Sequence, residues 1–217
     1  HTNQKRKALA HSDGIICVSE NTKRDMLHFF PELAEKKTVV IPHGVGKHFY
    51  QIEKKELSSK DYFNGRPFIL YVGDRKAIYK NFNLTVRASK LSGLPLAIIG
   101  GSPLTDKEQV FINSKLQVDD YVHFSGVSNE ELNEFYNRAL CLVYPSSYEG
   151  FGLPLLEAQS AGCPIIAMNT SSIPEVVEDS GILLEEESPE LIAGQSILID
   201  ANANAGSILD IDAGIID

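Results

Sequence analysis

The chain has 217 residues, 43% of them hydrophobic, and a formal net charge of −9 at pH 7. A chain of this length and composition can bury a substantial core in one domain or slightly more, and its acidic balance argues against a nucleic-acid-binding protein. Its apolar runs are far shorter than the roughly 18 residues that a membrane-spanning helix needs, and no secretory signal opens the sequence.

Short apolar segments rich in β-formers alternate with segments of helical length along most of the chain. We expect strands at Gly14 to Val18, Thr38 to Ile41, Pro67 to Val72, Leu96 to Ile99, Val122 to Ser125, Leu140 to Tyr144, Pro164 to Met168 and Ile182 to Leu184. A helix is expected from Ser128 to Ala139, where Ser128 and Glu131 have capping-box spacing. The stretch from Tyr50 to Gly65 has no clear period and predicts a surface loop with a helical turn. This alternation predicts an α/β fold: a Rossmann-like, doubly wound parallel sheet with helices on both faces.

Cations follow the apolar strand that ends at Val72. The segment Val72-Gly73-Asp74-Arg75-Lys76-Ala77-Ile78-Tyr79-Lys80-Asn81 places Arg75 and Lys80 at the carboxyl end of a strand. A planar arginine fork and a lysine point charge suit the oxygens of a diphosphate. For an isolated Arg-x-x-x-x-Lys, a solvated basic loop would be the expected alternative.

A glycine-rich turn follows the strand Leu140 to Tyr144. The turn extends from Pro145 to Gly152, and the helix after it has Pro154 in its first turn and ends at Gly162. The N–H groups at the start of such a helix favour phosphate oxygens.

Two carboxylates, Glu149 and Glu157, lie eight residues apart across this turn. Gly150 and Gly152 let the backbone approach a ligand closely. Because ionised carboxylates only accept hydrogen bonds, the pair suits the hydroxyls of a sugar and a ribose. The alternative is that Glu149 only complements the helix dipole and that Glu157 is a solvated helix residue.

Short motifs in a fixed order suggest a family. They are Ala8 to Lys23, Val40-Ile41-Pro42-His43-Gly44-Val45, Tyr71-Val72-Gly73 with Tyr79-Lys80-Asn81, Ile98-Ile99-Gly100-Gly101, Val122 to Ser128 with Glu131-Leu132, Glu149 to Glu157, and Ser172-Ile173-Pro174-Glu175-Val176-Val177. Their order and spacing resemble the nucleotide-sugar-binding, C-terminal half of a family 4 retaining glycosyltransferase (glycosyl transferases group 1) of the GT-B fold, over most of the chain. The resemblance implies transfer of a hexosyl unit from a nucleotide-diphosphate sugar to an acceptor, with retention and without a metal or other cofactor, in polysaccharide or glycolipid synthesis.

The resemblance also implies roles for single residues. Glu149 would lie near the transferred sugar and Glu157 at the ribose, while Arg75 and Lys80 would hold the diphosphate and stabilise the leaving nucleotide. Many relatives place the arginine directly after the glycine, whereas Asp74 intervenes here, which leaves Lys76 as an alternative to Arg75. The other implied donor-binding positions are Gly73, Gly101, Val127, Gly150, Phe151, Gly152 and Leu153, with the loop around Val127 facing the base.

The same resemblance implies a division of the chain. Residues 1–43 would be the end of an N-terminal domain and the interdomain crossing, residues 44–187 the donor-binding domain, and residues 188–217 an atypical C-terminal tail. The chain begins at His1 without an initiator methionine, so we expect a piece of a longer protein. The glycan or lipid-linked acceptor would be held by an N-terminal domain upstream or by a partner chain. Alone, this chain is expected to bind nucleotide and to transfer poorly.

The donor and the reaction stay open at this point. The Gly-Asp-Arg…Tyr-Lys-Asn form resembles mannosyltransferases of surface-polysaccharide assembly and favours GDP-mannose over UDP sugars. The alternatives to a transferase are a non-catalytic donor-binding subunit or degenerate half, and a GT-B-fold epimerase acting on a sugar nucleotide.

The tail and the charged surface carry less information. Asp200 onward shows no periodic apolar face, so we expect partial disorder or an atypical end there. Asp210-Ile211-Asp212 has the spacing of a metal-binding Asp-x-Asp, but without a strand and loop around it we expect no metal site.

All Lys and Arg residues precede residue 139. For patches such as Lys5-Arg6-Lys7 and Lys23-Arg24 we expect a solvated helix face; peripheral association with an anionic lipid surface is the alternative.

The three cysteines, Cys17, Cys141 and Cys163, are expected to be buried core residues in a reducing compartment. This agrees with a cytoplasmic protein, with the inner membrane face as a possible peripheral location.

Overall fold

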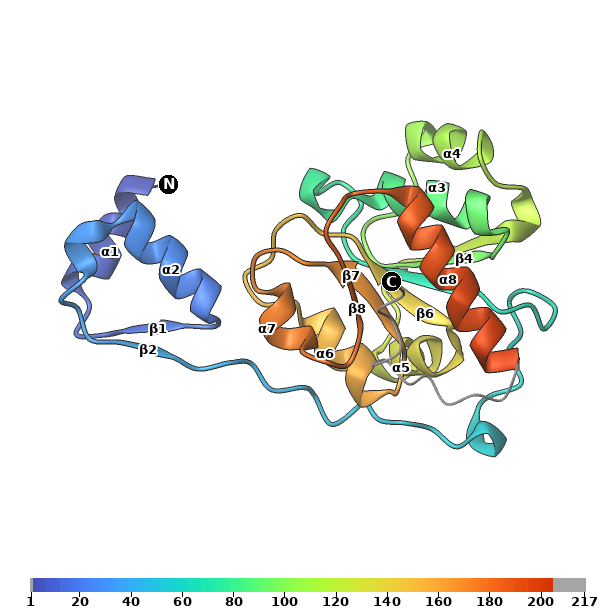
Figure 1. The fold of residues 1–217 in the computed structure, drawn as a ribbon, viewed down its shortest axis with the longest axis horizontal. Coiled ribbons are helices and arrows are strands. Elements are labelled where there is room, and N and C mark those ends of the chain that lie inside the picture. Colours follow the sequence, from blue (N-terminus) through green and yellow to red (C-terminus); the bar gives the residue numbers. More distant parts are fainter. Residues whose placement is uncertain (1, 205–217) are drawn as a thin grey trace, which may run out of the picture.

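The computed structural model describes residues 2–204, which form a small N-terminal part and a larger α/β domain (Figure 1). In the N-terminal part, residues 2–40, two parallel strands form a two-stranded sheet beside two helices. A small core of Ile15, Cys17, Met26, Phe30 and Leu33 holds these elements together. The elements are α1 (Thr2–His11), β1 (Ile15–Cys17), α2 (Glu20–Phe29), the 3-10 turn η1 (Pro31–Leu33) and β2 (Thr38–Val40).

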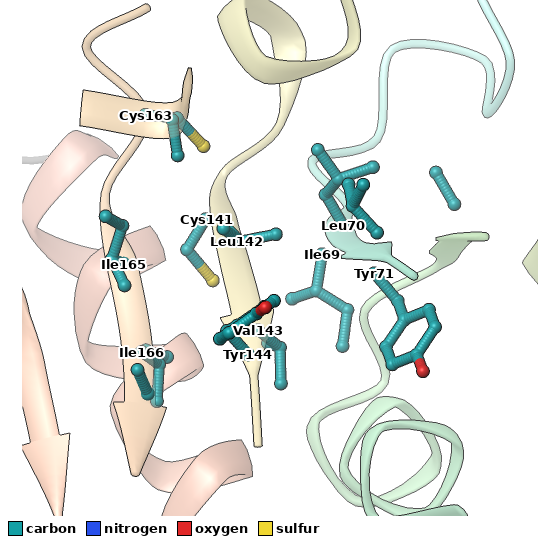
Figure 2. Packing of buried hydrophobic residues seen from close by; sticks show 14 of the residues in the cluster. Ile69, Leu70, Tyr71, Cys141, Leu142, Val143, Tyr144, Cys163, Ile165 and Ile166 are labelled. Carbon is teal, nitrogen blue, oxygen red and sulfur yellow. The ribbon is translucent and has the colours of Figure 1, made fainter. Parts of the chain in front are cut away.

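The α/β domain is built on a parallel six-stranded sheet with the strand order β5-β4-β3-β6-β7-β8. Its strands are β3 (Ile69–Val72), β4 (Leu96–Ile99), β5 (Tyr121–Phe124), β6 (Cys141–Tyr144), β7 (Ile165–Met168) and β8 (Ile182–Leu184). Every residue of β3, β4, β6 and β7 is buried. Both faces of these strands are covered, which explains their continuous apolar sequences. Figure 2 shows side chains of this core around the central strands.

Helices cover both faces of the sheet (Figure 1). Helices α3 and α8 pack against each other, whereas α6 contacts both α5 and α7. The helices are α3 (Phe82–Ser92), α4 (Asp106–Asn113), α5 (Asn129–Arg138), α6 (Leu153–Ser160), α7 (Ile173–Val177) and α8 (Pro189–Asn204), and the 3-10 turns are η2 (Lys54–Glu56), η3 (Ile78–Lys80) and η4 (Val118–Asp120). Among the described residues, no helix is long and apolar enough to cross a membrane.

The predicted fold class is confirmed. Each expected strand is present within two residues of its predicted ends, and the loop from Tyr50 to Gly65 contains the expected helical turn, η2. The capping box before α5 is also present: the Ser128 hydroxyl accepts from the Glu131 N–H, and the Glu131 carboxylate accepts from the Ser128 N–H.

The C-terminal boundary differs from the expected one at residue 187. Helix α8 buries Ile192, Ala193, Ser196 and Ile199 and packs on α3, so it is part of the α/β domain. These buried positions have a helical spacing. The spacing is hard to recognise in the sequence because the apolar stripe is short and is interrupted by Asn, Gly and Ser residues. Residues 205–217, including Asp210-Ile211-Asp212, lie outside the described residues.

Candidate functional site

The strand order changes direction between β3 and β6. From β3 the chain adds β4 and then β5 toward one edge of the sheet, and from β6 it adds β7 and then β8 toward the other. In open parallel sheets, ligands bind at the carboxyl ends of the strands beside such a switch point. Lys80 lies in the segment after β3 and Glu149 in the loop after β6, so the topology places both at this position.

Lys80 and Glu149 form an ion pair. The Lys80 Nζ lies 2.6 Å from the Glu149 Oε1 and donates a second hydrogen bond, of 3.1 Å, to the Tyr144 hydroxyl. The ammonium also lies 5.0 Å from the centre of the Tyr144 ring. The two charged side chains are only 14% and 11% exposed, so the pair is shielded from bulk water and its attraction is stronger than at an open surface.

The loop that carries Glu149, residues 145–152, is held by its backbone. The Glu149 N–H donates to the Ser171 Oγ at 2.8 Å, and the Ser172 hydroxyl donates to the carbonyls of Glu149 and Phe151 at 2.8 and 3.1 Å. The Ser147 N–H donates to the Tyr79 carbonyl at 2.8 Å. These bonds join the Glu149 loop to the segment after β7 and to the turn that carries Lys80.

Several N–H groups in the same loop have no hydrogen-bond partner within residues 2–204. They belong to Gly150, Phe151, Gly152 and Leu153. Helix α6 starts at Leu153 without a side-chain cap, and Gly152 before it has a φ of +105°, a conformation that favours glycine. Unpaired N–H groups at a helix start, together with the helix dipole, form a cradle for an anion.

Arg75 lies in a different environment from the one expected. Its side chain is 1% exposed, and Nε pairs with the Glu108 carboxylate at 3.0 Å. The terminal nitrogens donate to the Gly100 carbonyl at 2.6 Å and the Ser102 carbonyl at 2.5 Å. The guanidinium is therefore engaged inside the protein, whereas the sequence suggested a cation available to a diphosphate. The neighbouring Lys76 is exposed.

The groups around Arg75 have shifted pKa values. Burial opposes ionisation of Glu108, but hydrogen bonds from Thr105 and from Arg75 outweigh it and lower the pKa of this carboxyl. His123 lies 3.0 Å from Arg75, and burial together with this positive charge lowers the pKa of the imidazole. A carboxylate beside the guanidinium and a neutral histidine both suit a permanently charged Arg75.

Glu157 lies on α6 and is held separately from Glu149. Its Oε2 accepts a hydrogen bond of 2.9 Å from the hydroxyl of Tyr136, a fully buried residue of α5. Burial raises the pKa of Glu157, and the Tyr136 hydrogen bond only partly offsets it. The carboxylate thus keeps unused acceptor positions in a partly dry environment.

The glycines expected at the site lie at the ends of β3 and β4. A Cβ on Gly73 would lie 3.7 Å from the Lys80 Cδ, and a Cβ on Gly101, whose φ is +70°, would lie 2.8 Å from the Arg75 Nη1. Val127 is half-buried between β5 and α5 and packs against the core. The structure therefore brings Gly73, Lys80 and Glu149 together, with Gly101 beside Arg75.

Sequence reasoning missed the residues that orient the charged groups. Tyr144 contacts Lys80, and Tyr136 contacts Glu157. Tyr144 could have been singled out from the sequence, because it places a hydroxyl at the end of an otherwise apolar strand. Within residues 2–204, no group of three or more His, Cys, Asp or Glu side chains is placed to hold a metal ion.

Comparison with known proteins adds a family match. The profile of the family described as glycosyl transferases group 1 matches residues 53–203. The O-antigen chain mannosyltransferase B of Escherichia coli is 27% identical over 194 residues, which are 82% of this chain and 49% of that protein. The chain thus spans about half the length of this relative.

Solved structures show the same architecture. Sucrose-phosphate synthase from Thermosynechococcus elongatus matches 92% of this chain and 52% of its own, with a TM-score of 0.72 and 24% identity. Anabaena Alr3699/HepE, in complex with UDP and glucose, matches 92% of this chain and 55% of its own, with a TM-score of 0.72 and 17% identity. These neighbours have the GT-B fold, and this chain corresponds to its C-terminal half.

Proposed function

Because the chain belongs to the glycosyl transferases group 1 family, we propose that it binds a nucleotide-diphosphate sugar beside Lys80, Glu149 and the start of α6. The observation that carries the proposal is the shielded Lys80–Glu149 pair at the switch point of the sheet, next to the unpaired N–H groups of the Glu149 loop. A cation and free N–H groups suit a diphosphate, and a carboxylate beside them suits a sugar hydroxyl.

In this proposal each group has one task. Lys80 and the N–H groups of Phe151, Gly152 and Leu153 hold the diphosphate and stabilise its charge as the sugar leaves. Glu149 then accepts from a hydroxyl of the transferred sugar. These roles require Lys80 to exchange part of its contact with Glu149 for phosphate oxygens, and the Tyr144 hydroxyl and ring keep the ammonium in place during this exchange.

The nucleoside occupies the adjoining surface. Glu157 accepts from the ribose hydroxyls while it keeps its bond to Tyr136, and the loop around Val127 faces the base. The missing Cβ of Gly73 leaves room beside Lys80, where the ligand would lie, and that of Gly101 leaves room for Arg75 in the turn behind it.

Arg75 takes a role different from the one the sequence suggested. Its bonds to the carbonyls of Gly100 and Ser102 and to Glu108 hold the turn after β4 against the end of β3. Those contacts would have to break before the guanidinium could reach a phosphate, so the proposal assigns the diphosphate to Lys80 and the α6 N–H groups.

For the whole protein we propose transfer of a hexosyl unit, with retention, to a glycan or lipid-linked acceptor in polysaccharide synthesis. Mannose from GDP-mannose is the favoured sugar, supported by the Gly-Asp-Arg…Tyr-Lys-Asn form and by the resemblance to an O-antigen chain mannosyltransferase. The acceptor would be held by an N-terminal domain or a partner chain.

Calorimetric titration of the chain with GDP, UDP, ADP and their sugars tests the donor site. We expect selective binding of one nucleotide, weakened about 30-fold in Lys80→Ala because a charge-assisted contact contributes roughly 2 kcal/mol. Glu157→Ala is expected to weaken binding through the loss of the ribose contact.

Lys90→Ala is the charge control, since it removes an exposed lysine from α3 outside the candidate site, and it is expected to bind like the unchanged chain. An affinity of Lys80→Ala equal to that of the unchanged chain would refute the role of Lys80, and the absence of binding to every nucleotide would refute the donor site. Release of free UDP with an epimerised sugar, in the absence of an acceptor, would instead identify an epimerase.

A further inference from the structure

Helix α2 of the N-terminal part begins directly on the Glu149 loop. The hydroxyls of Ser19 and Thr22 both donate to the carbonyl of Gly150, at 2.8 and 2.9 Å. Gly150 is the residue after Glu149, so the contact lies one peptide unit from the carboxylate that pairs with Lys80. The Tyr148 hydroxyl adds a bond of 2.6 Å to Asp25, further along α2.

Glu175 caps the same helix from the other side. Its two carboxylate oxygens accept from the N–H groups of Glu20 and Asn21, each at 2.7 Å. These N–H groups open α2, and its N-cap residue, Ser19, accepts from the Thr22 N–H. A carboxylate that accepts two N–H bonds at the positive end of a helix dipole makes a strong charge-assisted contact.

The contacts form a closed arrangement around the loop. Ser172 donates to the Glu149 carbonyl, Glu175 follows three residues later and holds α2, and α2 returns to the carbonyl of Gly150 through Ser19. The Glu149 loop is thus enclosed between α2 and the start of α7. The motif Ser172-Ile173-Pro174-Glu175 supplies both sides of this enclosure, and the donor-binding role does not otherwise use it.

We propose that Glu175 is a positioning residue that couples the N-terminal part to the donor site by fixing α2 on the Glu149 loop. Rotation of residues 2–40 away from the α/β domain breaks the bonds from Ser19, Thr22 and both N–H groups together. The Gly150 carbonyl then loses its partners, and the Glu149 loop is held only by its bonds within the α/β domain. The structural part of this inference stands alone, while its effect on a nucleotide rests on the proposed function.

Hydrogen–deuterium exchange on the full chain tests the cap without a ligand. In Glu175→Ala we expect the amides at the start of α2 to exchange about tenfold faster or more, and those of the Glu149 loop to exchange faster as well, because a charge-assisted cap is lost. Glu175→Gln keeps one acceptor oxygen and is expected to be intermediate. Amides of β3 serve as the internal reference for an intact fold.

Glu187→Gln is the matched control, because this carboxylate is exposed and makes none of the hydrogen bonds that hold α2. Unchanged exchange at the start of α2 in Glu175→Ala would overturn the cap. Faster exchange in α2 with an unchanged Glu149 loop would overturn the coupling. Ser19→Ala with Thr22→Val is expected to loosen the loop from the opposite side.

Titration with GDP and UDP then measures the effect on the site. We expect Glu175→Ala to weaken nucleotide binding several-fold, with partial recovery in Glu175→Gln and no change in Glu187→Gln. Affinity in Glu175→Ala equal to that of the unchanged chain would refute the coupling. Absence of binding in the unchanged chain would refute the proposed function and leave the exchange result standing.

Discussion

Two cations that follow the same strand have opposite environments. Lys80 is held on one side by Glu149 and Tyr144, beside unpaired N–H groups, whereas Arg75 is enclosed by Glu108 and by the carbonyls of the turn after β4. The sequence predicted both as cations at a strand end, which is where they lie. It could not separate their roles, because the partners that enclose Arg75 come from segments 25 to 48 residues away.

The partly buried carboxyl of Glu157 opposes stability when it is ionised. Burial raises the pKa of its carboxyl in the folded chain above the unfolded value. Such a group favours folding while it is protonated, below the unfolded pKa, and this contribution is lost as the pH rises through the folded pKa. Ionisation of Glu157 in the folded protein therefore costs stability as the pH rises.

Glu157→Gln removes that cost, since glutamine is neutral at every pH and still accepts a bond from Tyr136. We expect thermal unfolding at pH 7 to occur at a higher temperature in Glu157→Gln than in the unchanged chain, with the difference vanishing at about pH 4, near the unfolded pKa of a glutamate. Nucleotide binding should weaken at the same time. A constant difference at all pH values would contradict this account, and Glu187→Gln, at an exposed site, supplies the reference.

At the scale of elements, the turn after β4 requires a glycine at position 101, because a side chain there would collide with Arg75. Gly101 has a φ of +70°, and a Cβ there would lie 2.8 Å from the Arg75 Nη1. We expect Gly101→Ala to destabilise the chain by about 1–3 kcal/mol, from the left-handed backbone and from displacement of Arg75.

Gly194→Ala is the opposite case, because this residue lies in α8 and a Cβ there would meet nothing within 4 Å. Alanine in a helix interior is expected to stabilise by about 0.5–1 kcal/mol. Urea unfolding of both variants measures the change in the free energy of unfolding, which is expected to fall in Gly101→Ala and to rise in Gly194→Ala. A higher stability of Gly101→Ala would refute the requirement for glycine in this turn.

Elements could be predicted from the sequence in proportion to their burial. Strands β3, β4, β6 and β7 are buried throughout, so their apolar runs were unambiguous. The segment Ser188-Pro189-Glu190-Leu191 has the pattern of a helix start, but the rest of helix α8 could not be predicted from the sequence. Its buried stripe is short and mixes Ile192 with Ala193 and Ser196, which resembles an irregular tail until α3 is seen beside it.

For the whole molecule, the order of elements could be predicted and their contacts across the chain could not. The bonds from Ser19 and Thr22 to Gly150 join residues 131 and 128 positions apart, and the bond from Glu20 to Glu175 spans 155. The spacing of residues within a short segment gives no indication of such a pair. These contacts depend on how the N-terminal part packs against the α/β domain.

The pairing of Lys80 with Glu149 has a consequence for how fast a ligand arrives. The pair presents almost no net field to an approaching nucleotide, Arg75 is likewise matched by Glu108, and the chain as a whole carries a charge of −9. If the donor binds as proposed, we expect a diphosphate to reach the site without steering and to be recognised only after contact, when Lys80 is released from its carboxylate. In stopped-flow mixing we expect the association rate constant to change less than about twofold between roughly 0.05 and 0.5 M salt, with selectivity among nucleotides expressed in their dissociation rates. A steep fall of the association rate with salt would mean that an unpaired cation guides the ligand in.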